Sequence, residues 1–239
     1  RNFNVNVPCP SVPATGRVTT ILLTLNDPGI PQSVASTLVR NTAGWVTPTT
    51  NPRVAVLEDD NHHGEDVADT TYVTNLLRSH GYNTTVLREP AEGFEYDALE
   101  DYDILWLSNP GWPMDDVSTF HAMRQAASEG KGLVFQGDDM SWSMGNAFPL
   151  NSVNGMVHTD NGTSMCGKRT DNRQGASYAV TFGGGHPLTD DLEDVSVRYG
   201  NDIDHAQTIG NQSFEVAWAR LDDPTPCRDE VPVVVGVDP

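Results

Sequence analysis

Four short apolar runs alternate with amphipathic segments, and this rhythm constrains the fold more than any other feature of the chain. The runs are 54–57, 84–87, 104–107 and 132–135. Between them, 69–80 and 117–129 favour helices, and a glycine follows each helix. Short runs without polar alternation are typical of strands buried on both faces of a parallel sheet. The sequence therefore predicts an α/β fold with an open, mainly parallel sheet, right-handed crossovers and helices on both faces.

The segments on either side of this region extend the prediction. Three later apolar runs favour further strands, antiparallel and at the edge of the sheet. They are 178–182, 214–218 and 233–235. Residues 1–52 differ in composition, because Asp27 is their only acidic residue and Thr, Val, Asn and Pro are frequent. Within them 17–25 favours a strand and 31–40 a short helix. We therefore expect an N-terminal β-rich extension and linker over 1–52, followed by an α/β domain over 53–239.

A strong negative charge limits the partners of the chain. The sequence has 33 Asp and Glu against 14 Lys and Arg, which leaves a formal net charge of -19. Such a surface repels a phosphate backbone or an anionic membrane, and it attracts cations. No apolar run reaches the roughly 18 residues of a membrane-spanning helix. The expected partner is a small molecule or a glycan, with no nucleic acid and no membrane insertion.

The cysteines bear on where the protein works. Cys9, Cys166 and Cys227 all lie in polar stretches rather than in apolar runs. These positions suit one disulfide and one odd thiol in an oxidising compartment. Three reduced cytosolic thiols are the alternative, and the sequence assigns no pairing. We therefore expect an exported protein, extracellular or periplasmic.

Six segments of the chain form a recognisable series of motifs. They are Arg53-Val-Ala-Val-Leu57, His80-Gly-Tyr82 at a helix end, Tyr102-Asp-Ile-Leu-Trp-Leu107, Gly130-Lys-Gly-Leu-Val-Phe135, Gly185-His-Pro-Leu-Thr-Asp-Asp-Leu192 and Pro232-Val-Val-Val-Gly236. Their order resembles that of the class I glutamine amidotransferase-like superfamily, in the branch that includes trehalose-utilisation-type proteins. The resemblance covers about residues 53–239. It implies a flavodoxin-like, amidotransferase-like sheet.

The chain departs from this superfamily at the residues that would carry catalysis. The resemblance implies a Gly-x-Cys-x-Gly turn after the strand 132–135, with a thiolate at a helix N-terminus. This chain has Gly137-Asp-Asp-Met-Ser141 there. A carboxylate cannot form a thioester with glutamine, and Ser141 lacks the glycine that a strained serine elbow requires. Glutamine amidotransferase activity is therefore not expected.

Polar side chains follow three of the predicted parallel strands, and ligands bind beyond the carboxyl ends of such strands. We predict that they converge in one crevice. The expected ligand-binding residues are Asn109, Trp112, Asp138 and Asp139. The expected metal-binding residues are Asp59, Asp60, His62 and His63. Carboxylates with loop carbonyls suit Ca²⁺ or Mg²⁺, and added histidines shift the preference towards Zn²⁺.

A structural explanation exists for each of these groups. Adjacent acids such as Asp59 and Asp60, or Asp138 and Asp139, also cap helices and face water. Neighbouring histidines on an extended chain point to opposite sides. The metal is therefore an expectation, with no cofactor as the alternative.

Three functions remain open from the sequence. The leading hypothesis is a secreted, non-catalytic binding or accessory domain for glycans or other cell-surface material. The first alternative is a metal-dependent hydrolase that uses the carboxylate and histidine site, with a metal-bound hydroxide as nucleophile. The second is a structural domain of a larger surface protein.

Overall fold

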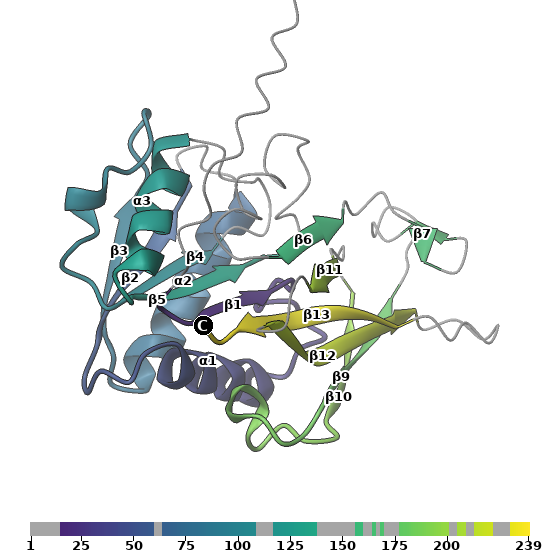
Figure 1. Cartoon of the computed structure of the whole chain (residues 1–239). Coiled ribbons are helices and arrows are strands. Elements are labelled where there is room, and N and C mark those ends of the chain that lie inside the picture. The colour runs from purple at the N-terminus through teal and green to yellow at the C-terminus, as the bar shows by residue number, and fades with distance from the viewer. Residues whose placement is uncertain are drawn as a thin grey trace, which may run out of the picture.

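A mixed sheet of nine strands organises the part of the chain that the computed structural model describes (Figure 1). The described residues are 15–59, 64–108, 117–137, 156–159, 164–165, 168–169, 177–200, 205–208, 213–221 and 230–239. The strand order is β10-β9-β12-β13-β1-β5-β4-β2-β3. The predicted α/β class with a largely parallel core is confirmed.

The parallel half of the sheet contains the four strands that the apolar rhythm predicts, together with β1. Its members, in spatial order, are β1 (Val18–Ile21), β5 (Gly132–Gln136), β4 (Ile104–Ser108), β2 (Arg53–Glu58) and β3 (Asn83–Arg88). Every residue of β4 and β5 is buried, as expected for strands covered on both faces. The edge strand β3 is mostly exposed.

The antiparallel half continues the sheet from the other side of β1. It contains β13 (Glu230–Val237), β12 (Ser213–Leu221), β9 (Tyr178–Phe182) and β10 (Ser196–Tyr199). The three late strands predicted from sequence are β9, β12 and β13, and their antiparallel pairing is confirmed. Two small antiparallel pairs lie outside this sheet. They join β6 (Met156–Thr159) to β11 (His205–Thr208) and β7 (Ser164–Met165) to β8 (Lys168–Arg169).

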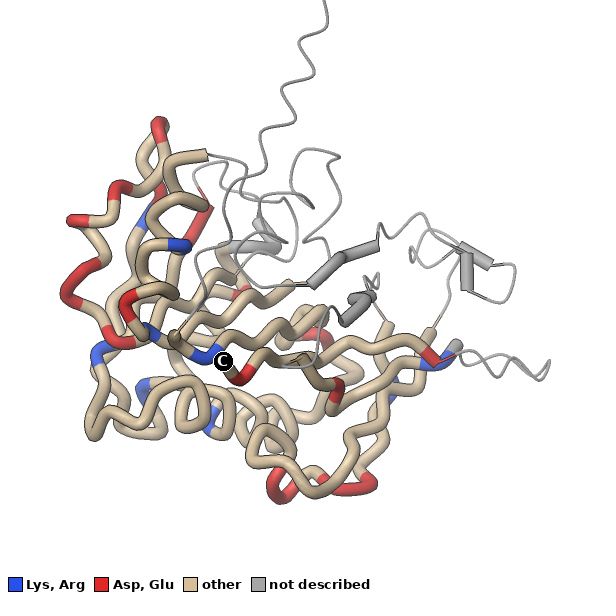
Figure 2. Tube along the Cα trace, in the orientation of Figure 1, with Lys and Arg blue, Asp and Glu red and all other residues tan. Residues whose placement is uncertain are grey.

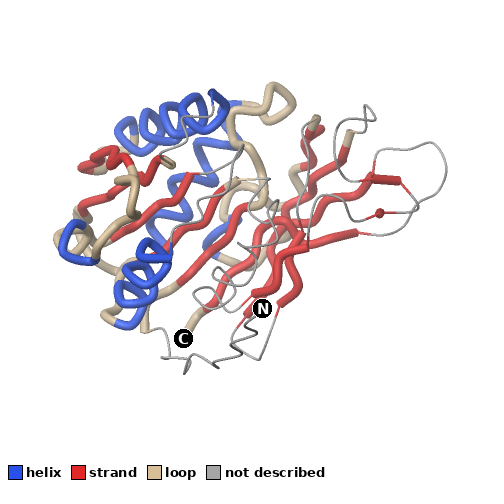
Figure 3. Tube along the Cα trace, turned by 90° about the horizontal axis from the view of Figure 1, so that it is seen from above, coloured by secondary structure: helices blue, strands red, loops and turns tan. Residues whose placement is uncertain are grey.

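Helices cover both faces of the parallel half (Figures 1 and 3). On one face α1 (Gln32–Val46) and α2 (Gly64–Ser79) contact each other, and α3 (Val117–Ser128) covers the other face. Short 3₁₀ turns, η1 (Tyr96–Ala98) and η3 (Pro187–Thr189), lie in the connections. No described helix has both the length and the apolar character needed to cross a membrane.

Residues 15–52 are an integral part of this sheet. β1 pairs with β5 on one side and with β13 on the other, so it is the middle strand of the nine. α1 buries its apolar side chains, Leu38, Val39 and Trp45 among them, against the sheet. The structure thus includes this segment within the α/β fold, where composition alone suggested an extension beside it.

Basic residues form hydrogen bonds at the edge of the sheet where the parallel strands begin, which we call the amino edge. Arg17 donates to the carbonyl of Trp45 at 2.9 Å, pairs with Asp238 and lies over the Trp45 ring. Lys131 likewise donates to the carbonyl of Tyr102 at 2.7 Å. Figure 2 shows basic positions close to the C-terminal end of the trace, where Arg17 and Asp238 meet. These contacts satisfy one carbonyl group at the end of α1 and one just before β4.

The close packing of α1 on β5 yields a testable prediction. A Cβ atom added at Gly132 would lie 2.7 Å from the carbonyl oxygen of Val46, a backbone atom at the end of α1. Gly132→Ala is therefore expected to lower the free energy of unfolding by about 2 kcal/mol, as overpacking does. Urea denaturation measures this change.

Gly44, in the last turns of the same helix, provides the matched control. A Cβ there would meet only the Tyr82 hydroxyl, at 3.8 Å. Gly44→Ala should therefore stabilise the protein by about 0.5–1 kcal/mol, because alanine favours the helix. Equal effects of the two substitutions would contradict the proposed packing of α1 on β5.

Candidate functional site

The parallel strands end at one edge of the sheet, which we call the carboxyl edge. From β2 the chain passes through α2 to β3, and from β4 it passes through α3 to β5, in the opposite direction along the sheet. Between the neighbouring strands β2 and β4 the chain order therefore reverses. In open α/β sheets, ligands bind outside the carboxyl ends of the strands at such a switch point.

Asp69 of α2 lies beneath this edge and is fully buried. Its Oδ1 accepts a hydrogen bond from the backbone amide of Asn26 at 3.0 Å, and its Oδ2 accepts one from the Ser108 hydroxyl at 3.1 Å. The backbone amide of Leu25 and the side-chain amide of Gln136 also donate to it. One carboxylate thereby joins α2 to the segment after β1 and to the last residues of β4 and β5.

Burial raises the pKa of the Asp69 carboxyl from 3.8 to about 6. The hydrogen bonds from Asn26, Gln136, Ser108 and Leu25 lower the pKa, but they offset only part of the loss of hydration. None of these four donors carries a positive charge. Among the described residues, the groups that donate hydrogen bonds to Asp69 are therefore all uncharged.

Gln136 supplies a second buried polar group at this edge. Its Nε2 donates to the carbonyl of Leu23 at 2.8 Å, and its residue pairs directly with Ser108 of β4. Within the described part of the chain its Oε1 is buried and accepts no hydrogen bond. A buried acceptor without a hydrogen bond is energetically costly, and a donor from water or from a ligand would remove this cost.

Other carboxylates near the carboxyl edge are buried as well. Asp59, directly after β2, is 1% exposed, and Glu89, directly after β3, is 4% exposed. Glu89 accepts a hydrogen bond from the Thr119 hydroxyl, whose oxygen accepts the amide of Phe94 at 2.8 Å. Buried carboxylates are uncommon unless they are paired, and here they follow neighbouring strands.

The loop after β1 adds one more buried acid, Asp27, which holds this loop against β10. Asp27 accepts hydrogen bonds from the amides of Gly29, at 2.7 Å, and Gly200. Burial raises its pKa, and these two hydrogen bonds partly oppose the rise. The hydroxyl of Tyr199 accepts the amide of Thr24 at 3.1 Å in the same region. The position of Asn26, and with it that of Asp69, depends on these contacts.

Of the residues predicted for the site, only Asp59 lies within the described part of the chain. The others lie outside it, and they are Asp60, His62, His63, Asn109, Trp112, Asp138 and Asp139. The strands that precede them, β2, β4 and β5, are neighbours and end at the same edge. The convergence of these side chains stays a prediction. The cysteines Cys9, Cys166 and Cys227 also lie outside the described residues.

A metal centre is not formed by the described residues alone. Among them no three His, Cys, Asp or Glu side chains are grouped so that they could hold an ion. The predicted metal set therefore depends on Asp60, His62 and His63, in addition to Asp59.

Sequence reasoning did not single out Asp69, Ser108 or Gln136. Asp69 lies on the buried face of α2, four residues before Val73 and eight before Leu77. A polar residue within this apolar pattern was the available signal. The apolar pattern also predicts a helix that begins at Asp69, and acidic residues are common in the first turn of a helix. In the structure α2 begins earlier, at Gly64.

Comparisons with known proteins agree with the fold. No protein-family model matches the sequence, and no curated protein matches it. A putative ThuA-like protein from Bacteroides uniformis superposes with a TM-score of 0.54 and 12% identity, over 80% of each chain. A putative GMP synthase component from Thermoplasma acidophilum gives a TM-score of 0.43 and 11% identity, over 73% of this chain and 80% of that one. The chain has an amidotransferase-like α/β fold.

The raised pKa of Asp69 predicts a pH dependence of stability. The folded protein holds this proton more tightly than the unfolded chain, so stability falls as the pH rises through the interval between 3.8 and about 6. At neutral pH the ionised carboxylate costs about 3 kcal/mol. Asp69→Asn removes the charge and keeps an acceptor for Asn26. The free energy of unfolding of the wild type, relative to this variant, should therefore fall by about 2 kcal/mol from about pH 4 to about pH 7.

Denaturant unfolding at several pH values tests this prediction. Asp101→Asn is the control, because Asp101 is exposed and 3.5 Å from Arg53 at the other edge of the sheet. Its profile should run parallel to that of the wild type between about pH 5 and about pH 7. A constant difference between the wild type and Asp69→Asn across the pH range would contradict the buried, proton-binding state of Asp69.

Proposed function

We propose that the chain is an amidotransferase-like domain that binds a ligand at the carboxyl edge of its parallel sheet and does not hydrolyse glutamine. The observation that carries this proposal is the buried Asp69 carboxylate, which holds α2 and the ends of three parallel strands together at the switch point. The ligand that we propose is a glycan or other cell-surface material. The proposed location is extracellular or periplasmic.

The absence of a cysteine from the segment directly after β5 supports binding rather than amidotransferase catalysis. The residue after Gly137, where the superfamily resemblance implies a nucleophile, is aspartate. The carboxylate of Asp138 is a poor nucleophile towards an amide, and the three cysteines lie far along the sequence from this turn. We therefore propose that the chain belongs to a non-catalytic branch of the superfamily.

The rigidity of the strand ends supports a preformed site. A binding site is most effective when its first residues are held by packing and by further hydrogen bonds. Asp69 provides such bonds to Ser108, directly before the segment with Asn109 and Trp112, and to Gln136, two residues before Asp138. The predicted ligand-binding residues thus follow the strand ends that Asp69 fixes.

The chemistry of the edge supports a ligand that donates hydrogen bonds. Its described polar groups include the Oε1 of Gln136, which accepts no hydrogen bond from a described residue. The hydroxyl groups of a glycan donate to such acceptors, and the indole of Trp112 would stack on a sugar ring. The net charge of -19 disfavours polyanionic ligands.

Binding to an immobilised panel of neutral and cationic glycans tests the proposal. Asp138→Ala is expected to weaken binding by about tenfold, the loss of a hydrogen bond to a charged group. It should leave the free energy of unfolding within about 0.5 kcal/mol of the wild-type value, because the proposal gives this side chain a role in ligand binding rather than in packing.

Asp101→Ala is the matched control, because it removes the same charge at the amino edge. It should bind the panel as the wild type does. Equal losses of affinity in the two variants would reduce the effect to net charge, and equal losses of affinity and stability in Asp138→Ala would reveal a helix cap. Release of ammonia from glutamine by the wild type would refute the non-catalytic assignment.

A metal-dependent hydrolase is the second candidate function. The observation that favours it is the burial of Asp59, at 1% exposure, directly before Asp60, His62 and His63. A divalent ion would compensate several carboxylates in one crevice, and it would lower the pKa of a bound water. We propose Ca²⁺, Mg²⁺ or Zn²⁺ as the cofactor of this alternative.

Thermal unfolding of chelator-treated protein separates the two functions. For the hydrolase, one of ZnCl₂, CaCl₂ or MgCl₂ should stabilise the wild type by about 3 kcal/mol at a hundredfold excess over the Kd. Asp59→Asn should abolish this gain, while Asp101→Asn should retain it. No stabilisation by any of the three salts would leave the binding domain as the supported function.

A further inference from the structure

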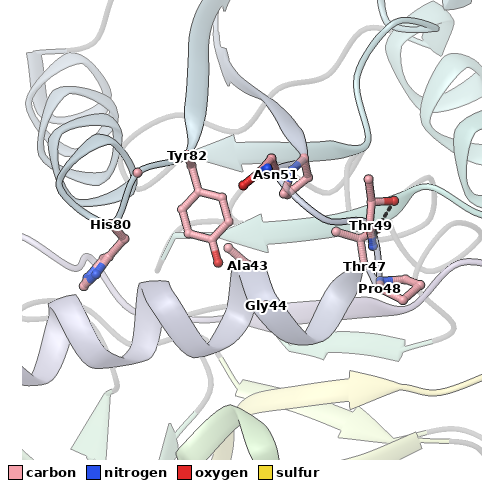
Figure 4. Close-up of a pocket in the computed structure, with 10 residues that line it drawn as sticks. Ala43, Gly44, Thr47, Pro48, Thr49, Asn51, His80 and Tyr82 are labelled. Carbon is pink, nitrogen blue, oxygen red and sulfur yellow. Dashed lines mark hydrogen bonds between the residues drawn. The ribbon is translucent and has the colours of Figure 1, made fainter.

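A pocket of about 350 Å³ opens at the amino edge of the parallel strands, opposite the carboxyl edge (Figure 4). Its walls come from the last turns of α1, the connection from α1 to β2, and the connection from α2 to β3. The volume lies near the lower end of the range of about 300–1,000 Å³ that small-molecule sites occupy. It is sufficient for a small ligand of one or two rings.

The pocket is neutral, although the chain as a whole is strongly acidic. Among the described residues that line it there is no Asp, Glu, Lys or Arg. The only titratable side chains in this described lining are those of His80 and Tyr82. Burial raises the pKa of Tyr82, so the phenol stays uncharged at neutral pH. A neutral lining favours a neutral ligand over a cation, in contrast to the acidic carboxyl edge.

The ring of Tyr82 provides an apolar surface in this neutral pocket. Figure 4 shows the ring between His80 and Asn51, with its hydroxyl directed towards α1. The side chain is half-buried, and its hydroxyl is 3.5 Å from the carbonyl oxygen of Arg40. Pro48 adds a second apolar ring to the lining. Aromatic faces of this kind pack against the C–H groups of a sugar ring.

Gly44 independently indicates that this space is kept open. It is exposed on α1, and an added Cβ would approach only the Tyr82 hydroxyl, at 3.8 Å. No positive φ angle requires glycine at this position. Glycine lowers helix stability relative to alanine, so neither packing nor backbone geometry explains it. Because Gly44 has no side chain, a ligand can reach the hydroxyl end of the Tyr82 ring.

Polar groups surround the ring. The Thr47 hydroxyl accepts the amide of Thr49 at 3.2 Å and donates to the Thr49 hydroxyl at 3.1 Å, which fixes this turn. Asn51 is exposed, and none of its side-chain atoms is hydrogen-bonded to a described residue. His80 Nε2 lies 2.8 Å from the hydroxyl and 3.1 Å from the carbonyl oxygen of Ser36. Assigning the ring proton to Nε2 leaves Nδ1 as an acceptor.

We propose that this pocket binds a neutral saccharide of one or two rings. The C–H face of the sugar packs on Tyr82, and its hydroxyls form hydrogen bonds with Thr49, Asn51 and His80. The pocket is separate from the carboxyl edge, so the proposal does not rest on the function proposed for that edge.

Isothermal titration calorimetry of the full chain tests this proposal, with glucose, galactose, mannose, N-acetylglucosamine and maltose as probes. At least one sugar is expected to bind with a Kd on the order of 1 mM, as about a dozen ligand atoms allow. Gly44→Leu fills the pocket without removing any side chain, and it should weaken binding by about tenfold or more. Tyr82→Ala should have a similar effect, whereas Tyr82→Phe retains the ring and should bind within about threefold of the wild type.

Ser33→Leu is the matched control, because it places the same side chain at an exposed position near the other end of α1. It should bind as the wild type does, and thermal unfolding should show that both leucine variants are folded. Trp112→Ala removes the side chain that would stack on a sugar at the carboxyl edge. Binding that is retained in this variant and lost in Gly44→Leu is therefore assigned to the pocket. The proposal is overturned if no sugar binds at about 50 mM, well above the expected Kd. It is equally overturned if Gly44→Leu binds as tightly as the wild type, or if Trp112→Ala alone abolishes binding, since the sugar would then occupy the carboxyl edge.

Discussion

The carboxylate of Asp69 is the interaction on which the geometry of the carboxyl edge depends. It receives donors from the segment after β1, from Ser108 and from Gln136, so one side chain sets the positions of α2 and of three strand ends together. Its removal would leave several buried donors unsatisfied, which costs more than the loss of any one hydrogen bond. The network joins α2 to the described ends of β4 and β5 and to the segment after β1.

The two edges of the parallel sheet differ in chemistry because the strands begin and end with different residues. At the amino edge Arg17 and Lys131 donate to carbonyls, and the neighbouring pocket is neutral. At the carboxyl edge Asp59, Asp69 and Glu89 are buried acceptors. Within the described residues, one edge of the sheet therefore contains buried carboxylates, and the other borders a pocket lined by no Asp, Glu, Lys or Arg.

The sequence predicts those parts of the fold that local periodicity encodes. The strands and helices between residues 53 and 136 match the apolar rhythm, and β9, β12 and β13 follow from their apolar runs. The central place of β1 has no local signal, because it depends on pairing with β13 from the other end of the chain. The role of Asp69 was hidden for the same reason, since its partners Asn26 and Gln136 are distant in sequence. The neutral pocket likewise arises from the end of α1 and two separate connections.

The position of β1 has a consequence for the order in which the sheet forms during synthesis. Val18 and Val237 are paired, so the middle of the sheet is closed by β13, which is synthesised after the other strands of the sheet. Until then the open side of β1 offers unpaired amide and carbonyl groups to other chains. Long-range pairing of this kind is slow and exposes the nascent chain to aggregation. A chaperone that shields β1 during synthesis would therefore act on the step that joins the two halves of the molecule.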